Sequence, residues 1–116
     1  MIEEKLDILK ESKVISEEAF HYSHKVLNRL MQKGVIQDTD EVDALITHLA
    51  MATTRQGSDE VVDSVDESVL KEIKESDYYD EAVNIWNELK EIAPTDFATN
   101  EDGYFHLHLV TLLQTD

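Results

Sequence analysis

The sequence has no cysteine, only one proline and three glycines, and no long apolar run. Without cysteine, disulfides, thiol chemistry and thiolate-bound metal sites are all excluded. No apolar run approaches the roughly 18 consecutive residues that a membrane span needs, so we expect no membrane-spanning segment. The first residues, MIEEK, lack the basic and apolar regions of a secretion signal. We therefore expect a soluble protein of the cytoplasm.

Basic side chains are also scarce. Ten Lys and Arg residues stand against 26 Asp and Glu residues, which gives a net charge of −16 at neutral pH. Such a charge repels the phosphate backbone of nucleic acids and anionic membrane surfaces. We therefore expect neither direct nucleic-acid binding nor membrane binding. A basic protein partner fits this charge, and so does a charge that serves solubility alone.

What the sequence does have is a helical spacing of apolar residues. Strand-like alternation is absent, and apolar positions recur every three or four residues. At 116 residues, the chain has room for one domain with a modest core. Helices that each carry one apolar stripe must pack together to bury it. We predict an all-α fold, a compact five-helix bundle over residues 16–116. An N-terminal extension over residues 1–15 precedes it, in which residues 1–12 have room for a short additional helix.

Capping and helix-breaking residues predict where the first two main helices begin and end. Ser16 is the expected N-cap of the first helix, and Gly34 its expected C-terminal stop. Asp38 and Glu41 have the spacing of a capping box and open the second helix. A flexible turn at residues 57–59 (GSD) is expected to end that helix.

Similar signals predict the remaining three helices. Ser64 with Glu67 repeats the capping spacing before the third helix. Pro94 closes the fourth helix, because the residue before a proline disfavours the helical conformation. The last helix is expected to begin near Thr99 or Asn100 and to run through Leu113.

His48 is a candidate functional residue because it borders an apolar stripe. It follows Leu45 by three residues and precedes Ala52 by four, and Arg55 lies seven residues further on. A seven-residue step turns a helix by about 700°, so Arg55 lies almost directly below His48. A neutral imidazole can attack a phosphoryl group, and a guanidinium matches the geometry of the resulting phosphate. The position also fits a histidine that only packs and bonds to a neighbouring helix.

His108 is the second candidate, in the last predicted helix. It shares a face with Tyr104 and Thr111, and Glu101 lies seven residues before it. Glu101 could accept a hydrogen bond from the imidazole ring and thereby fix its tautomer. Seven residues span about 10 Å along a helix, so this contact needs long side chains, a kink or a water molecule. Packing at the edge of the core is the alternative role for His108.

The other three histidines give no metal or catalytic pattern. His21 and His24 stand three residues apart, but no carboxylate pattern completes a zinc site. We expect His21 to be solvated and His24 to be packed. His106 lies about 200° around the helix from His108, so the two cannot easily bind one metal. A glycine-rich phosphate loop and a nucleophile-elbow serine are also missing. We therefore expect no metal, no cofactor and no enzyme activity.

Both histidine segments resemble the phosphotransferase-system regulation domain, or PRD. The first half of that domain carries a pattern like D/T-H-L-x-x-A-x-x-R, and residues 47–55 read THLAMATTR. Its end carries E-x-G-[FY]-[IF]-x-L-H-[IL], and residues 101–109 read EDGYFHLHL. The order of the motifs and the length between them also fit, and the resemblance covers roughly residues 16–114. Either motif alone is weak, but the two in order are fairly specific.

The resemblance implies a compact five-helix bundle that pairs as a homodimer. In such domains two histidines accept a phosphoryl group from the histidine-containing phosphocarrier protein or from a sugar-specific enzyme II. The matching positions are His48 and His108, while Arg55 and Glu101 match supporting positions. The implied function is control of gene expression, or of a partner protein, in response to sugar uptake.

This chain departs from such regulators in two respects. They usually carry paired copies of the domain with a module that binds RNA or DNA, whereas the sequence shows one copy and no such module. His106 is an extra histidine where an apolar or small residue is common. Two other functions therefore stay open. One is a non-enzymatic acidic helical adaptor whose histidines only pack, and the weaker one is a small, metal-dependent helical enzyme.

Overall fold

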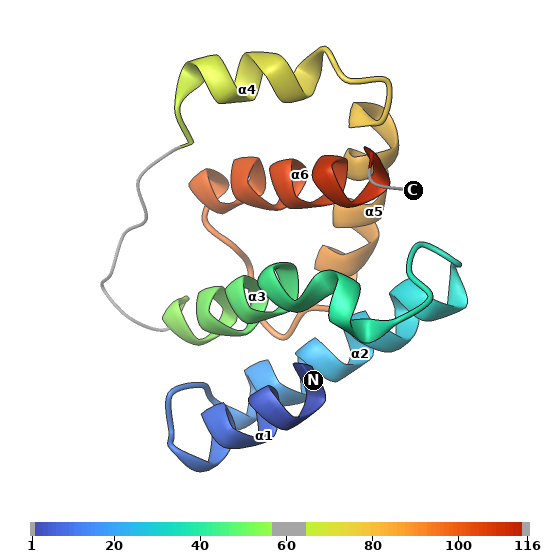
Figure 1. The fold of residues 1–116 in the computed structure, drawn as a ribbon. Helices are drawn as coiled ribbons and strands as arrows, with labels where there is room; N and C mark the ends of the chain where they lie inside the picture. The colour runs from blue at the N-terminus through green and yellow to red at the C-terminus, as the bar shows by residue number, and fades with distance from the viewer. Residues whose placement is uncertain (1, 57–64, 115–116) are drawn as a thin grey trace. The chain divides into compact units, whose positions relative to one another are not determined.

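The structure, a computed structural model, describes residues 2–56 and 65–114 (Figure 1). The chain divides into two compact units, Met1–Asp59 and Glu60–Asp116, here called the N-terminal unit and the C-terminal unit. The N-terminal unit contains α1 (Ile2–Glu11), α2 (Glu17–Gln32), the 3-10 helix η1 (Thr39–Val42) and α3 (Asp43–Arg55). The C-terminal unit contains α4 (Glu67–Lys74), α5 (Tyr79–Glu91) and α6 (Thr99–Gln114).

The predicted all-α class is confirmed, but the predicted number of five helices is wrong. Over the described ranges the chain forms six α-helices and no strand. The sixth is α1, in the segment where the sequence had room for a short helix. Ile2 and Leu6 lie one turn apart on this helix, and both side chains are fully buried. Burying each apolar side chain contributes about 1.5–3 kcal/mol, which helps to hold this ten-residue helix in place.

Polar contacts add to this anchoring of α1, which packs against α2, η1 and α3. The Lys5 ammonium lies 3.1 Å from the Asp43 carboxylate, and the Thr39 hydroxyl donates to Glu3. The Lys5–Asp43 pair is about half exposed, so it contributes little beside the buried side chains. The separation of residues 1–15 from the rest as an extension stays a prediction.

The predicted ends of α2 are confirmed by its caps. The Ser16 hydroxyl accepts a hydrogen bond from the Ala19 N–H at 3.1 Å. At the other end Gly34 adopts φ +74°, a left-handed conformation that glycine reaches without strain. Its N–H donates to the Met31 carbonyl, and the next N–H, of Val35, donates back into the helix. This reversal satisfies carbonyl groups that the helix end leaves unpaired.

The predicted capping box forms, but it opens η1 rather than α3. The Glu41 carboxylate accepts from the Asp38 N–H at 3.1 Å, and the Asp38 carboxylate accepts from the Asp40 N–H. The chain then passes directly from η1 into α3 at Asp43. A single 3-10 turn ahead of an α-helix is common at helix N-termini. The turn predicted at residues 57–59 lies outside the described residues.

In the C-terminal unit, α4 begins at Glu67 with Asp66 as its N-cap. The predicted cap Ser64 lies outside the described residues. One Asp66 carboxylate oxygen accepts from both the N–H and the hydroxyl of Ser68, each at 3.0 Å. These two bonds favour the ionised carboxylate and lower the pKa of Asp66.

The ends of α5 and α6 follow the sequence predictions closely. α5 ends at Glu91, three residues before Pro94, and α6 begins at Thr99 and continues to Gln114. α6 packs against both α4 and α5. None of the helices within the described ranges is long and apolar enough to cross a lipid bilayer.

Candidate functional site

His48 lies on α3 at the boundary that its spacing predicts. The apolar stripe of this helix, which includes Leu45 and Leu49, is buried, and α3 packs against α2. His48 is partly exposed, and Met51, one turn further on, is 37% exposed. The imidazole therefore occupies the edge between the core and the outer surface of α3.

Arg55 lies in the last turn of α3 and is partly buried. A cation is favoured there because the helix dipole is negative at its C-terminal end. The hydroxyls of Thr53 and Thr54 donate to the carbonyls of Leu49 and Ala50 at 2.7 and 2.9 Å. The Thr54 hydroxyl oxygen also accepts the N–H of Ser16, which ties this turn to the start of α2. The helix end that carries Arg55 is thus held by side-chain bonds.

His108 lies on α6, in the C-terminal unit. It is partly exposed, while the next residue, Leu109, is fully buried and Thr111 is exposed. Glu101 lies in the first turn of the same helix and is only 1% exposed. A carboxylate near a helix N-terminus interacts favourably with the positive end of the helix dipole. The two histidines therefore belong to different units, each with its predicted supporting residue on its own helix.

Gly103, in the second histidine motif, allows α4 to approach α6 closely. A Cβ atom at this position would lie 3.1 Å from Leu70 Cδ2 and 3.3 Å from Val65 Cγ2. Both distances are tighter than ordinary van der Waals contact. Glycine in a helix costs about 1 kcal/mol relative to alanine. The glycine of the EDG sequence thus serves the packing of α4 against the helix that carries His108.

Asp102 joins α5 to α6, a role that the sequence analysis missed. Its carboxylate accepts from the indole N–H of Trp86 at 2.7 Å and from the Lys90 ammonium at 3.3 Å. The Trp86 ring stacks on Phe105, with 4.1 Å between ring centroids and 17° between planes. One signal could have revealed this contact, because a tryptophan on an apolar stripe needs an acceptor for its N–H when buried.

The remaining histidines occupy three different environments. His21 is exposed and His24 packs edge-on against Phe20 at 4.6 Å, as both were predicted to do. His106 is partly buried, and its ring meets the edge of Tyr79 at 5.8 Å. Burial lowers the pKa of His106, against the opposing effect of the nearby Asp102 carboxylate. Over residues 2–56 and 65–114, no group of three or more His, Asp or Glu side chains is placed to hold a metal ion.

The helices that carry the two candidates have unusually few carboxylates. Residues 44–56 and residues 103–115 contain no Asp or Glu, although acidic residues make up 26 of 116 in the chain. Burial explains part of this absence. However, the exposed positions Ala44, Met51 and Thr111 carry no negative charge either. The thirteen-residue stretches around the two histidines therefore add no carboxylate, and the acidic residues of both helices lie in their first turns.

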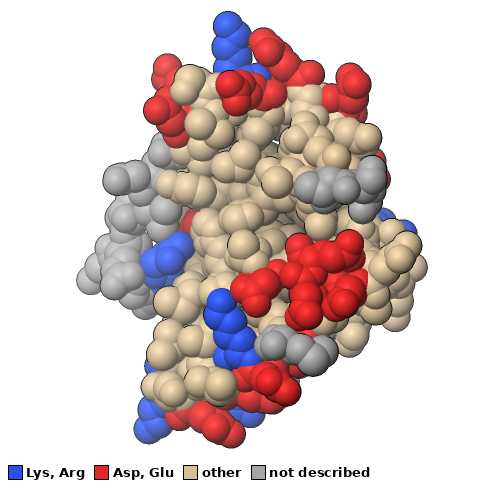
Figure 2. Space-filling view, viewed as in Figure 1, with Lys and Arg blue, Asp and Glu red and all other residues tan. Residues whose placement is uncertain are grey.

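The charge of the chain is divided unevenly between the two units. The N-terminal unit has eleven acidic and seven basic residues, and the C-terminal unit has fifteen acidic and three basic residues. Their net charges are therefore −4 and −12, with histidine neutral. On the face of the molecule seen in Figure 2, acidic side chains gather in several places among fewer basic ones.

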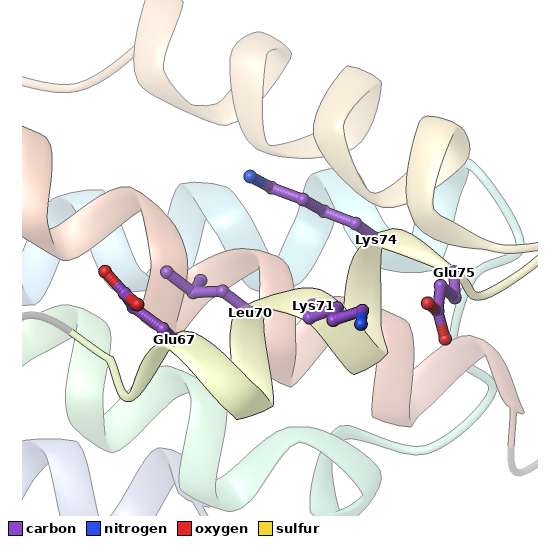
Figure 3. A pocket seen from close by; sticks show the side chains of 5 residues that line it. All are labelled: Glu67, Leu70, Lys71, Lys74 and Glu75. Carbon is purple, nitrogen blue, oxygen red and sulfur yellow. The ribbon is translucent and has the colours of Figure 1, made fainter.

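A surface hollow of about 540 Å³ runs along α4 and contains none of the four predicted site residues. Figure 3 shows its lining, which comes from α4 and the residue that follows it. The residues are Glu67, Leu70, Lys71, Lys74 and Glu75. With two cations and two anions beside one leucine, this hollow has no net charge that would select an anionic or a cationic ligand.

The family model described as PRD domain matches residues 22–112 of the chain. A search of curated proteins and a search of solved structures each found no match. The matched region includes both histidine motifs, while α1 and the first turn of α2 precede it. Because the match covers most of the sequence in a single copy, the chain belongs to the PRD family.

Proposed function

We propose that this chain is a regulatory domain that phosphotransferase-system proteins phosphorylate on His48 and His108. The observation that carries the proposal is the PRD family match, which spans both histidine motifs. The partial exposure of both histidine residues supports it, because a phosphoryl donor must reach the side chain. The regulatory nature of PRD domains is consistent with a chain that is not an enzyme.

The reaction moves one phosphoryl group between two imidazoles. The lone pair of an unprotonated nitrogen of His48 or His108 attacks the phosphorus on the phosphohistidine of the phosphocarrier protein. One N–P bond forms on the acceptor ring while the N–P bond of the donor breaks. The acceptor ring then releases its N–H proton, and the departing donor ring takes up one proton. Both rings end neutral, and no co-reactant is needed.

The charges near each acceptor support this reaction. A phosphoryl group brings nearly two negative charges, and neither acceptor helix places a carboxylate among the thirteen residues around its histidine. Arg55, two turns below His48 on α3, is the cation proposed to bind the phosphorylated imidazole. Glu101 is proposed to orient the ring of His108 as a hydrogen-bond acceptor.

The regulatory output is proposed to pass through contacts between protein chains. We propose a cytoplasmic homodimer whose stability changes when a dianionic group is added at His48. The dimer in turn would control gene expression, or the activity of a partner protein, in response to sugar uptake. Direct contact with nucleic acid is not part of the proposal, since the net charge of −16 opposes it.

The test is a phosphorylation assay with the purified chain. Phosphorylated histidine-containing phosphocarrier protein is mixed with wild type, His48→Ala, His108→Ala or the double variant, and acid-labile phosphate is located by mass spectrometry. Each single variant is expected to lose the label at its own position, and the double variant is expected to remain unlabelled. His21→Ala is the matched control, because His21 is more exposed than either candidate and lies on α2.

Two outcomes would overturn the proposal. Active phosphocarrier protein, or a sugar-specific enzyme II, could leave both His48 and His108 of the wild type unlabelled. The label could also stay at the wild-type level in the double variant. A chain without any label would instead fit the acidic helical adaptor, in which the histidines only pack.

A further inference from the structure

The outer face of α2 is basic, although the protein is strongly acidic. Residues 19–37 form the longest stretch of the sequence without Asp or Glu, and they contain three of its ten basic residues. Lys25 and Lys33 are exposed, and Arg29 between them is partly exposed. These three side chains project from successive turns over about 12 Å, because they are spaced four residues apart. With the exposed Asn28 and Gln32, they form what we call the α2 basic face.

The C-terminal unit offers a surface of opposite charge where α4 turns into α5. Residues 72–81 contain one lysine and five carboxylates, all of them exposed. In the middle of this segment Tyr78 is 40% exposed. The segment is called the acidic corner below. Its carboxylates are Glu72, Glu75, Asp77, Asp80 and Glu81.

The acidic corner is held in one shape by hydrogen bonds around Ser76. The Ser76 hydroxyl oxygen accepts the N–H of Tyr78 at 3.1 Å and the side-chain amide of Gln114 at 3.0 Å. The Ser76 N–H donates to Ile73, and the Ser76 carbonyl accepts from Tyr79. A surface that is already ordered loses little conformational entropy when a partner binds. The backbone that carries the exposed Tyr78 is therefore held in place, and its side chain offers a partly apolar contact.

We propose that the α2 basic face of one copy of this chain docks on the acidic corner of a second copy. Three cations would then meet five carboxylates and one ammonium. Met31, 42% exposed at the border of the α2 basic face, would meet Tyr78, so each surface brings one apolar side chain to the contact. Tyrosine is enriched in the cores of protein interfaces, as is methionine. We choose a second copy as the partner because it carries a surface of complementary charge and is present wherever the first copy is.

The net charge of −16 on each copy does not prevent this contact. At physiological ionic strength the Debye length is about 8 Å, so charges outside the contact are largely screened from one another. The charges inside it lie much closer and act locally. In the proposed dimer the contact forms twice about a two-fold axis, so that the assembly is complete with two copies.

This inference rests on the homodimer in the proposed function, to which it adds a surface, and does not depend on phosphoryl transfer. Sedimentation equilibrium of the full chain tests it. Wild type is expected to reach twice its mass of 13.3 kDa with rising concentration, and to dissociate more as salt is raised. Lys25→Glu with Lys33→Glu is expected to raise the dissociation constant at least tenfold. The triple variant Glu72→Lys, Glu75→Lys and Asp77→Lys gives the acidic corner a net positive charge and is expected to do the same.

The sharpest test mixes these two charge-reversed variants. Each variant alone repels its own copies, but an equimolar mixture pairs opposite charges at both contacts. We expect the mixture to associate about as tightly as wild type. Lys13→Glu is the control, since it makes one such Lys-to-Glu charge reversal at an exposed residue outside both surfaces. It is expected to change the dissociation constant by less than twofold, with circular dichroism reporting that every variant is folded.

The possible failures are distinguishable. Reversed variants that associate like wild type, or a mixture no tighter than each variant alone, would overturn the docking surface and leave the homodimer standing. A wild type that stays at 13.3 kDa at every concentration would overturn both the homodimer and this surface. In either case, labelling of His48 and His108 would still report on phosphoryl transfer by itself. The variant Lys25→Glu with Lys33→Glu is expected to be labelled like wild type.

Discussion

The two units of this chain each carry one candidate histidine, but they surround it with different chemistry. In the N-terminal unit the charged companion on the same helix is the cation Arg55, and the net charge is only −4. In the C-terminal unit the companion is the buried carboxylate Glu101, and the net charge is −12. A phosphoryl group would therefore have a cation two turns away on α3 and a carboxylate two turns away on α6. The comparison indicates that the two histidines are not interchangeable acceptors.

The two units also differ in what fills their cores. The N-terminal unit buries mainly aliphatic side chains, with Tyr22 as its large buried aromatic residue. The C-terminal unit centres on the stack of Trp86 and Phe105, fixed by the bond from the indole to Asp102. A few large rings concentrate the stabilising contacts, whereas many aliphatic contacts spread them. Single substitutions should therefore damage the C-terminal unit more.

The largest effect is expected for Trp86→Ala. Removing a buried tryptophan should lower the free energy of unfolding by about 3–5 kcal/mol. If the two units are held separately, hydrogen exchange followed by mass spectrometry should accelerate in α4, α5 and α6 while α1, α2 and α3 stay protected. Trp86→Phe keeps a ring but not the N–H donor, so its cost should be smaller. Equal acceleration in all helices would break the comparison between the units.

A medium effect is expected for Gly103→Val. The new side chain would press on Leu70 and Val65, and such overpacking should lower the free energy of unfolding by about 1–3 kcal/mol in urea titrations. Ala44→Val is the control, because it adds a branched side chain at an exposed position of α3. If both variants lost equally little stability, the close approach of α4 to α6 would not matter energetically.

The contrast between the two acceptors is sharpened by Arg55→Ala. Losing a charge-assisted contact to the phosphorylated imidazole, about 1.4 kcal/mol, should lower labelling of His48 about tenfold and leave labelling of His108 unchanged. Arg55→Lys keeps the charge but lacks the planar guanidinium, so its labelling of His48 should lie between that of wild type and that of Arg55→Ala. Quantitative mass spectrometry of both sites in one sample makes the measurement. An equal decrease at both histidines would remove the contrast.

The smallest effect concerns the pKa of His106. Burial has the largest effect and lowers this pKa, the Asp102 carboxylate raises it, and the Lys90 ammonium lowers it further. We therefore expect Asp102→Asn to lower the pKa of His106 further and Lys90→Gln to raise it. Nuclear magnetic resonance titration of the imidazole signals would measure both shifts. Shifts of the same sign in the two variants would contradict this arrangement of charges.

The same lowered pKa predicts how stability depends on pH. Because the folded state lowers the pKa of His106 below its ordinary value of about 6.5, the unfolded chain binds a proton first as the pH falls. The contribution of His106 to stability is thus present above the pKa of about 6.5 in the unfolded chain. It is lost as the pH falls through the lower pKa of the folded state. His106→Gln should lack this part of the acid destabilisation in urea titrations at successive pH values.

Local signals in the sequence predicted much of the fold, because helix ends depend on near neighbours. Ser16 and Gly34 act within four residues of their own positions, so their roles at the ends of α2 could be read directly. Asp66 was missed because Ser64 offered a similar capping residue two positions earlier. α1 was left uncertain because its apolar side chains, Ile2 and Leu6, bury only against elements distant in the sequence.

For the candidate site too, features that depend on near neighbours in the sequence could be predicted, and those that depend on distant elements could not. Helical spacing placed His48 and His108 at the edges of apolar stripes, and the structure has both partly exposed. Spacing alone did not reveal the contacts of Asp102, since they need α5 and α6 to be positioned side by side, and the only available signal was that a buried Trp86 needs an acceptor for its N–H. Spacing likewise could not show that Gly103 lies against α4, or that Glu101 is buried rather than at the surface.

The single tryptophan of the chain gives the C-terminal unit a built-in optical reporter. Trp86 is fully buried, stacked on an aromatic ring and bonded through its N–H, so its fluorescence emission depends on the integrity of α5 and α6. The N-terminal unit has no tryptophan and therefore contributes no tryptophan emission. Emission and far-ultraviolet dichroism recorded together would therefore follow one half of the protein and the whole of it in the same sample.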